Sequence, residues 1–428
     1  MLDIKFIREN ADLVKKNLDK RNQPEKKELV DTILKHDKKW RFLKLKADKF
    51  RNQRNDLTAQ IQKLKTQNKD ADSKIKLAKE IPEKIKDTEA EMEELKKEIK
   101  SYINRIPNIL HENVPKGDSD KDNRPFRFYG KQTKHDFELK PHGEYLEESD
   151  LADFDQAAKV AGSGFYYLKG DLALLDIAIQ RYGIDFLLKK GFTLISPPIT
   201  LNKAAISCVI NFEDFRDVIY KIEGEDLYII PTAEHTLVVM YKNKTLKKED
   251  LPIKICALTP CFRKEIGSHG VDTRGLFRVH QFYKVEQVVL STEEDSYSHL
   301  EEMQKISEDF FKSLKIPFRV IEICSGDLGP KMSKQYDIEA WFPRQNDYKE
   351  VTSAGNTTTY QAASLGAKYI DGEEKKYIHM LNNTMVATSR TIVAIIENFQ
   401  KKDGTITIPK PLRRYMNGKR KIMGVKNA

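Results

Sequence analysis

The sequence is short of the features that mark zinc-binding, secreted and membrane proteins. Its 428 residues include four cysteines, with no C-x-x-C pair and no Cys/His ligand spacing, so we expect neither a zinc site nor a disulfide framework. No uninterrupted run of about 18 apolar residues occurs, so we expect no membrane span. The first residues carry acid at Asp3 and no apolar segment, so we expect no signal peptide and a cytoplasmic location.

Two common nucleotide-binding signatures are also missing. Neither G-x-x-x-x-G-K nor a G-x-G-x-x-G that follows a strand is present, which disfavours P-loop and Rossmann binding. Charge, by contrast, is abundant: 75 Lys and Arg stand against 65 Asp and Glu, a formal net charge of +10. This excess fits a polyanionic partner, and it fits equally a lysine-rich, well-solvated surface.

Residues 27–106 have the pattern of two helices that pack against each other. Two apolar series step alternately by four and three residues, as heptad a and d positions do. The polar turn between them, at 66–72, is short enough to require antiparallel helices. Pro82 is expected in the first turns of the second helix, where its missing N–H costs least. The series are Leu43, Ala47, Phe50, Arg54 (the one flaw), Leu57, Ile61 and Leu64, and then Ala78, Ile81, Ile85, Thr88, Met92, Leu95, Ile99, Tyr102 and Ile106.

The two helices of this long antiparallel coiled-coil hairpin differ in charge. Residues 26–65 contain thirteen Lys and Arg against five Asp and Glu, whereas residues 74–105 contain nine against eight. The basic helix fits an ordinary solvated coiled coil, and it also fits a rod that lies along a phosphate backbone.

The composition changes near residue 115, where a polar stretch with Pro and Gly at 115–123 marks a linker. We therefore divide the chain into residues 1–115, with the arm at about 27–106, and a second domain at 116–428. Short β-branched runs between amphipathic segments, as at 228–230, 288–290 and 318–323, predict an α+β fold with a mainly antiparallel sheet.

Residues 261–286 carry the pattern that is most informative about chemistry. Two strand-like pieces flank a glycine-rich loop at 266–275. Guanidinium groups, a carboxylate and an aromatic ring on one sheet face suit a nucleoside triphosphate, although an amphipathic hairpin would share the pattern. Alternation places on one face of each piece Arg263 and Glu265, and then Arg278, His280, Phe282 and Glu286.

Residues 380–398 predict a strand that leads into an apolar helix with Arg390 near its start. A phosphate would satisfy both this arginine and the N–H groups at the helix N-terminus. A structural arginine paired with Glu397 would give the same pattern.

These segments resemble the three signature motifs of class II aminoacyl-tRNA synthetases, and specifically the seryl-tRNA synthetases of the archaeal and eukaryotic branch. The first motif is matched by I-S-P-P at 195–198, after a helix-like stretch at 172–189. The second is matched by F-R-K-E at 262–265 and D-T-R-G-L-F-R-V-H-Q-F at 272–282, and the third by residues 382–397. P-T-A-E at 231–234 is similar to the family's serine-pocket signature, and the hairpin with its I-P-N exit at 106–108 is a further hallmark.

The resemblance implies a class II catalytic domain preceded by an arm that binds tRNA(Ser), and a homodimer formed through the first motif. It implies a serine–tRNA ligase that uses ATP and Mg²⁺ to activate L-serine and then charges the 3′ end of the tRNA. Whether tRNA(Sec) is also charged, and what the basic tail at 419–426 does, stay open.

The resemblance also implies roles for individual residues. Phe282 would stack on adenine, Arg263 would hold the α-phosphate and the serine carboxylate, and Glu234 would take the serine ammonium group. The catalytic residues would be Arg263, Arg390 and Glu350. The ATP site would comprise Arg263, Lys264, Glu265, Arg278, Val279, Phe282, Glu350, Val351, Thr352, Ser353 and Arg390, with Glu350 and Ser353 supporting Mg²⁺. The serine site would comprise Thr232, Ala233, Glu234, Arg263, Glu286, Asn382 and Thr384.

One segment departs from the family pattern. Where the family has an acid and two arginines after Ser353, this chain has Thr359, Ala363 and Ser364. If those groups form a pair, losing both ends leaves no orphan buried charge. The departure nevertheless supports a second hypothesis, a weak or inactive tRNA-binding paralogue. A third, a coiled-coil scaffold with a degenerate domain, conflicts with the retained residues of the second motif.

Overall fold

The computed structural model describes residues 1–212, 217–265 and 275–423. The chain forms two compact units that divide after Ile109, whereas the composition changes near residue 115. Three features of the sequence lie outside the described residues: the string D-T-R at 272–274, most of the expected glycine-rich loop, and the end of the basic tail.

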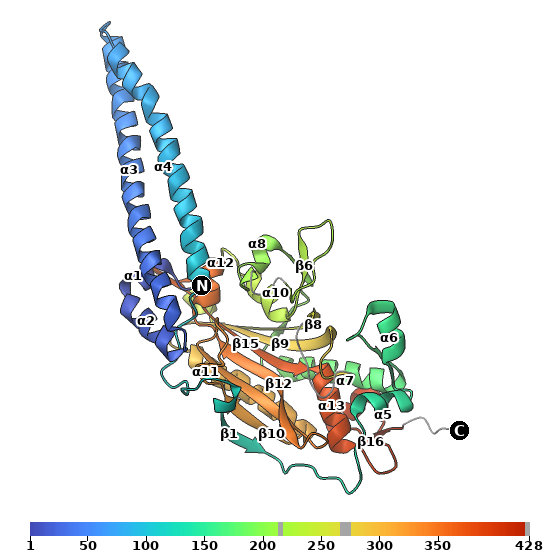
Figure 1. The fold of residues 1–428 in the computed structure, drawn as a ribbon. Coiled ribbons are helices and arrows are strands. Elements are labelled where there is room, and N and C mark those ends of the chain that lie inside the picture. The colour runs from blue at the N-terminus through green and yellow to red at the C-terminus, as the bar shows by residue number, and fades with distance from the viewer. Residues whose placement is uncertain (213–216, 266–274, 424–428) are drawn as a thin grey trace. The chain divides into compact units, whose positions relative to one another are not determined.

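The first unit contains the expected antiparallel hairpin (Figure 1). Its helices are α3 Lys27–Thr66 and α4 Asp72–Asn104, preceded by α1 Ile4–Glu9, α2 Ala11–Lys20 and the 3₁₀ turn η1 Pro24–Lys26. All members of the two heptad series are buried or half-buried except Arg54, which confirms the predicted seam. The 40 residues of α3 extend about 60 Å at about 1.5 Å per residue.

The prediction for Pro82 is wrong. Helix α4 begins at Asp72, so Pro82 lies in the helix interior, where its ring and missing N–H disturb the hydrogen-bond ladder. The neighbouring Ile81 and Ile85 are both buried in the seam, and their packing offsets this cost.

Charged and amide side chains fix the short helices of this unit to the hairpin. The buried carboxylate of Asp37 accepts from Arg8 at 2.9 Å and from Arg41 at 3.0 Å. The backbone carbonyl of Asn108, in the I-P-N exit, accepts from Asn17 at 3.1 Å and from Arg21 at 3.0 Å. These bonds satisfy polar groups that are buried where the second helix of the hairpin ends.

The second unit is built on a mainly antiparallel sheet, as predicted (Figure 1). Within the described residues, the strand order of this sheet is β1-β10-β11-β12-β15-β9-β8-β4, and only the β4–β8 pair is parallel. The strands are β1 Arg124–Tyr129, β4 Thr193–Leu194, β8 Ile253–Phe262, β9 Gln281–Ser291, β10 Phe318–Glu322, β11 Lys334–Phe342, β12 Asp347–Asn356 and β15 His379–Ala387.

Side chains of β9 alternate between two apolar cores, one on each face of this sheet. Val285 and Val289 pack with α7, α11 and α13, whereas Val288 and Leu290 pack with α8, α10 and α12. Even-numbered residues of β9 therefore face the second layer, which is the face that carries the candidate site. These helices are α7 Gly170–Leu188, α8 Lys203–Ile206, α10 Ala233–Val239, α11 Ser296–Leu314, α12 Tyr360–Leu365 and α13 Thr388–Phe399.

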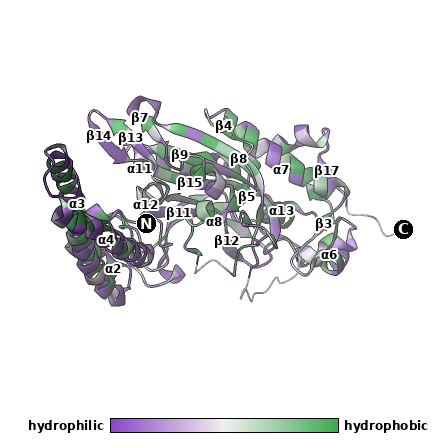
Figure 2. Ribbon diagram, turned by 90° about the horizontal axis from the view of Figure 1, so that it is seen from above, coloured by the Kyte–Doolittle hydropathy of each residue, from purple (hydrophilic) through white to green (hydrophobic). Residues whose placement is uncertain are grey.

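Smaller elements complete the second unit. They are α5 His142–Glu148, α6 Phe154–Ala161, β2 Ala152–Asp153, β3 Tyr167–Leu168, β5 Thr200–Asn202, β6 Leu227–Ile229, β7 Thr245–Lys247, β13 Lys368–Asp371, β14 Glu374–Tyr377, β16 Ile406–Thr407, β17 Lys421–Ile422, η2 Asp120–Asp122, η3 Lys248–Asp250 and η4 Lys410–Met416. Figure 2 shows that hydrophobic residues gather in the central strands, whereas the hairpin helices are mainly hydrophilic. In the described ranges, no helix combines the length and apolarity needed to span a membrane.

Candidate active site

A cavity of about 110 Å³ collects most of the residues that the resemblance implies for ATP. Four of its lining residues were missed in the sequence, namely Phe277, Lys284, Ala387 and Ser389. The full lining comprises Arg263, Glu265, Phe277, Arg278, Val279, Phe282, Lys284, Glu350, Val351, Thr352, Thr384, Ala387, Ser389 and Arg390.

The predicted strand alternation is correct for Phe282 and Glu286 but wrong for the other four positions. Strand β8 ends at Phe262 and β9 begins at Gln281, so Arg263, Glu265, Arg278 and His280 lie in the connection outside the strands. Side chains in a connecting loop do not alternate between two faces as they do in a strand. Glu265, for example, adopts a left-handed backbone with φ of 43°.

His280, although expected on the ATP-binding face, does not line the cavity. Its Nδ1 lies 2.6 Å from the hydroxyl oxygen of Tyr220, and its ring centroid lies 5.4 Å from that of Phe165. These contacts hold the connection in place, so His280 has a structural role.

Two arginines of the cavity are oriented by aromatic rings. The Arg263 guanidinium lies 5.4 Å from the Phe282 ring centroid, and its Nε donates to the Pro231 carbonyl at 3.2 Å. The Arg390 guanidinium lies 5.1 Å from the ring centroid of Phe277. A cation held against a ring face loses little freedom on binding an anion, which suits phosphate recognition.

Arg390 is the third residue of α13 and points to strand β12. It lies 3.4 Å from the Glu350 carboxylate and donates to the Glu350 carbonyl at 2.9 Å. Glu397 accepts from the backbone N–H of Arg344 at 3.0 Å instead, so the alternative of a structural Arg390–Glu397 pair is wrong. The cavity thus meets a helix N-terminus with a cation beside it, an arrangement that favours anions.

A second arginine–carboxylate pair faces the same cavity. The Arg278 guanidinium lies 3.7 Å from the Glu265 carboxylate, and both side chains line the cavity. Phosphate oxygens would compete with Glu265 and Glu350 for these two guanidinium groups, because arginine forms charge-assisted, often bidentate bonds with phosphate as it does with carboxylate.

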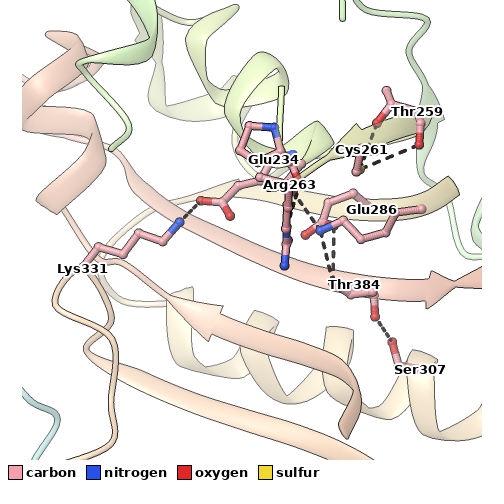
Figure 3. A network of polar contacts seen from close by, with 11 residues as sticks. Glu234, Thr259, Cys261, Arg263, Glu286, Ser307, Lys331 and Thr384 are labelled. Carbon is pink, nitrogen blue, oxygen red and sulfur yellow. Dashed lines mark hydrogen bonds and ion pairs between the residues drawn. The ribbon is translucent and has the colours of Figure 1, made fainter. Parts of the chain in front are cut away.

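A buried polar cluster adjoins the cavity (Figure 3). Lys284, only 6% exposed, donates to Thr232 Oγ1 at 2.8 Å and to Thr384 Oγ1 at 3.4 Å, and it forms an ion pair with Glu286. Burial raises the pKa of Glu286, and the nearby Lys284 charge offsets only part of that effect. The two-residue spacing of Phe282, Lys284 and Glu286 is the signal by which Lys284 could have been found.

Glu234 belongs to the same cluster and has two partners of its own. Its Oε1 accepts from Lys331 Nζ at 2.5 Å and from Gln361 Nε2 at 2.6 Å. Burial alone would raise the pKa of Glu234, but Lys331, His235 and these hydrogen bonds lower it to about 2. In Figure 3, Arg263 lies between Glu234 and Glu286. Arg263 also lines the cavity, so it joins the cavity to the buried cluster.

Four further residues implied by the resemblance do not line the cavity. Lys264 Nζ lies 5.6 Å from the ring centroid of Tyr220. Ser353 lies opposite Asp337 on β11, and its side chain bonds to the Asp337 carboxylate. Ala233 and Asn382 are buried in α10 and β15. Within the described ranges, no three His, Cys, Asp or Glu side chains are arranged to hold a metal ion.

The departures from the family pattern fall in and beside α12. Thr359 precedes this helix and Ala363 and Ser364 lie within it, all three half-buried. Gln361, which the pattern retains, is buried and bonds to Glu234. Among the described residues of α12, no buried side-chain oxygen or nitrogen is left without a hydrogen bond. The altered segment therefore remains compatible with an intact site.

Family models match both units of the chain. The seryl-tRNA synthetase N-terminal domain matches residues 1–110, and the tRNA synthetase class II core domain (G, H, P, S and T) matches residues 218–399. The serine–tRNA ligase of Methanospirillum hungatei is 47% identical over 98% of this chain and 99% of its own length. That of Pyrococcus horikoshii is 46% identical over 97% of this chain and 96% of its own length.

Solved structures agree with these matches along the whole chain. The crystal structure of seryl-tRNA synthetase from Pyrococcus horikoshii complexed with ATP has a TM-score of 0.92 and 45% identity, covering 100% of both chains. The cytoplasmic serine–tRNA ligase from Naegleria fowleri in complex with AMP has a TM-score of 0.86 and 34% identity, covering 100% of this chain and 99% of its own. The chain, with a class II sheet and a helical arm, belongs to the seryl-tRNA synthetase family.

Proposed function

We propose that this chain is a serine–tRNA ligase, which joins L-serine and ATP into seryl-adenylate and pyrophosphate and then transfers the seryl group to tRNA with release of AMP. The observation that carries the proposal is Arg263, which stands between an arginine-lined cavity and a small, buried polar cluster. The relatives that were solved with ATP or AMP support a nucleotide in this cavity. The hypothesis of an inactive paralogue has no support among the full-length relatives.

Adenylate formation on this surface depends on position and charge rather than on a protein nucleophile. Arg263 lies beside both the cavity and the buried cluster, so it can bind the α-phosphate and the serine carboxylate together and align them for attack. Arg278 and Arg390 neutralise the outer phosphates, and Phe282 stacks on the adenine. As pyrophosphate leaves, these guanidinium groups stabilise the charge that develops on it.

Serine is selected in the buried cluster by groups that need a polar partner. The hydroxyl of serine bonds to Glu286 and Thr384, whose partner Lys284 fixes their orientation. Alanine would leave these buried groups without that bond, which makes its binding costly. Glu234 binds the ammonium group of the substrate.

Mg²⁺ fits this site as an ion carried by ATP. Glu350 lines the cavity, and burial together with the charge of Glu350 raises the pKa of Asp337 on the neighbouring strand. A divalent cation would relieve this crowding of carboxylates. Mg²⁺ commonly takes one or two carboxylates plus substrate phosphates, so Glu350, with Ser353 as the second residue that the resemblance implies, would hold it. When bound, the ion neutralises phosphate charge.

The helical arm is the surface that binds tRNA(Ser). Residues 1–109 carry 29 Lys and Arg against 20 Asp and Glu, whereas residues 110–428 carry 46 against 45. The excess positive charge is thus almost confined to the first unit, where it can neutralise phosphates and release counterions.

A second copy of this chain covers the outer face of α7, so the protein is a homodimer. Ile177 of α7 is 58% exposed, and Leu188 and Leu194 are 42% and 43% exposed. A cavity of about 370 Å³ opens beside α7 and is lined by Ile177, Phe165 and Tyr283 among others. Exposed apolar surface of this kind marks an interface.

The four cysteines carry no disulfide, which suits the cytoplasm.

The test is ATP–pyrophosphate exchange with each of the twenty amino acids, followed by aminoacylation of tRNA. We expect exchange with serine alone and labelling of tRNA(Ser), with tRNA(Sec) as a further substrate to examine. A folded protein that exchanges with another amino acid, or that never labels tRNA, would contradict the proposal. Sedimentation of the same sample tests the homodimer.

A further inference from the structure

Glu234, to which the ammonium group of serine is assigned, is already engaged by an ammonium group of the protein. Lys331 Nζ lies 2.5 Å from Glu234 Oε1 (Figure 3). We propose that Lys331 is a positioning residue for serine, which fixes one carboxylate oxygen of Glu234 so that the other receives the substrate ammonium. The inference rests on the proposed function and concerns how its serine site is held in shape.

The geometry places both protein donors on the same carboxylate oxygen. Gln361 Nε2 also donates to Oε1, at 2.6 Å, and Gln361 Oε1 accepts in turn from the Thr357 hydroxyl at 3.1 Å. The Glu234 carboxylate is therefore held by α12 and by the connection before β11. A carboxylate fixed through one oxygen has its second oxygen directed in advance, which saves the cost of ordering it when serine binds.

Lys331 itself is anchored by its neighbours in the chain. Met332 is 7% exposed, and its Sδ lies so close to Gly355 that a Cβ at that glycine would approach it to 2.4 Å. Ser333 donates from its backbone N–H to the Asn356 carbonyl at 2.8 Å. Because the residues after Lys331 are held against β12, the backbone from which Lys331 reaches Glu234 is fixed.

The buried carboxylate of Glu234 needs a cation beside it in order to stay charged. Glu234 is only 5% exposed, and a carboxylate buried to this extent without a cation would take up a proton. Protonated Glu234 could not attract the ammonium group of serine. Lys331 keeps the charge on Glu234 when no substrate is bound, so that serine meets a carboxylate and not an acid.

The cation beside Glu234 does not come from the altered segment around α12. Ala363 and Ser364 bring no cation to this end of the helix, and Gln361 contributes only a neutral amide. The positive charge beside Glu234 comes instead from another part of the chain, the connection between β10 and β11.

The experiment compares Lys331→Met and Lys331→Arg with the unchanged protein in serine-dependent ATP–pyrophosphate exchange. We expect Lys331→Met to raise the KM for serine about tenfold or more, since loss of one partner of a buried pair is costly. The KM for ATP should change by less than about twofold, and Lys331→Arg should recover most of the serine affinity.

Lys334→Met is the matched control. Lys334 follows Lys331 by three residues and forms a similar ion pair, at 3.3 Å, with the buried Glu322. We expect it to leave the KM for serine unchanged, and to lower thermal stability less than Lys331→Met does, because Arg124 also pairs with Glu322. A rise in serine KM with both variants would show general loosening of the connection and overturn the inference.

A double-mutant cycle decides whether Lys331 acts through Glu234. Once Glu234→Gln is in place, adding Lys331→Met should change the serine KM by less than about twofold, because the partner is already gone. Additive effects would overturn the inference. A serine KM that falls in Lys331→Met would also overturn it, since Lys331 would then be a competitor of the substrate. If the unchanged protein shows no exchange with serine, the proposed function fails instead.

Discussion

The Arg390 guanidinium lies 3.4 Å from the Glu350 carboxylate and donates to the Glu350 carbonyl at 2.9 Å. This pair ties the start of α13 to β12 beside the cavity. It brings the predicted phosphate ligand and the predicted support for Mg²⁺ together, although 40 residues separate them in the sequence. Under the proposed function, phosphate would compete with the Glu350 carboxylate for Arg390.

We expect Arg390→Met to reduce the kcat of pyrophosphate exchange by a factor on the order of 100 or more, because a charge that stabilises the leaving phosphates is lost. The KM for serine should change little, since Arg390 is outside the buried cluster. Arg414→Met, which removes an exposed arginine paired with Asp185, is the control. Equal rates for the two variants would remove Arg390 from the reaction.

Glu286→Ala should abolish serine-dependent exchange and also destabilise the protein. The change leaves Lys284 buried without its ion partner, at a cost of about 3–5 kcal/mol. Glu286→Gln keeps a hydrogen-bonding group and should lose less stability while serine activation still falls. Exchange rates and urea unfolding separate the two effects. An unchanged rate in a folded Glu286→Ala protein would exclude this residue from the serine pocket.

Shortening the arm should separate the two halves of the reaction. Removal of residues 48–86, replaced by a short turn, deletes the outer part of both helices. Because the proposed seryl-adenylate site lies in the second unit, pyrophosphate exchange should persist. Charging of tRNA should be lost, and the intact protein should bind tRNA more weakly as salt rises. Efficient charging by the shortened protein would contradict a role of the arm in tRNA binding.

Acid should destabilise the protein in part through His235. Burial, with the nearby Lys331, Lys284 and Arg263 charges, lowers the pKa of His235 from 6.5 to about 3. Below pH 6.5 the unfolded chain therefore binds a proton at His235 that the folded chain does not. The contribution of His235 to the free energy of unfolding is fully present above that pH and is lost as pH falls toward 3. Between about pH 7 and about pH 5 this loss is about 2 kcal/mol.

Urea unfolding at the two pH values measures this effect. The stability difference should shrink by about 2 kcal/mol in His235→Asn. It should persist in His135→Asn, whose half-buried ring bonds to the Glu397 carbonyl. A pH dependence that is unchanged in His235→Asn would mean that other groups account for it.

The sequence predicted the repetitive parts of this fold well. Heptad spacing identified the seam of the arm, since helical pairing depends on residues close in the chain. The same reasoning misplaced Pro82, because local preference could not show that packing extends α4 back to Asp72. It also placed Arg263 and Arg278 within strands, whereas both lie in a connection whose shape follows no two-residue repeat.

The family, the antiparallel hairpin and most of the cavity residues could be predicted from the sequence, because they depend on motifs and periodicities that follow the order of the chain. The charge pairs could be found only in the folded protein: Arg390 pairs with Glu350 and not Glu397, Lys284 with Glu286, and Lys331 with Glu234. The order of strands in the sheet and the irregular connections bring such partners together. Because the attraction between two charges depends on their distance in space, the partners need not be regularly spaced along the sequence.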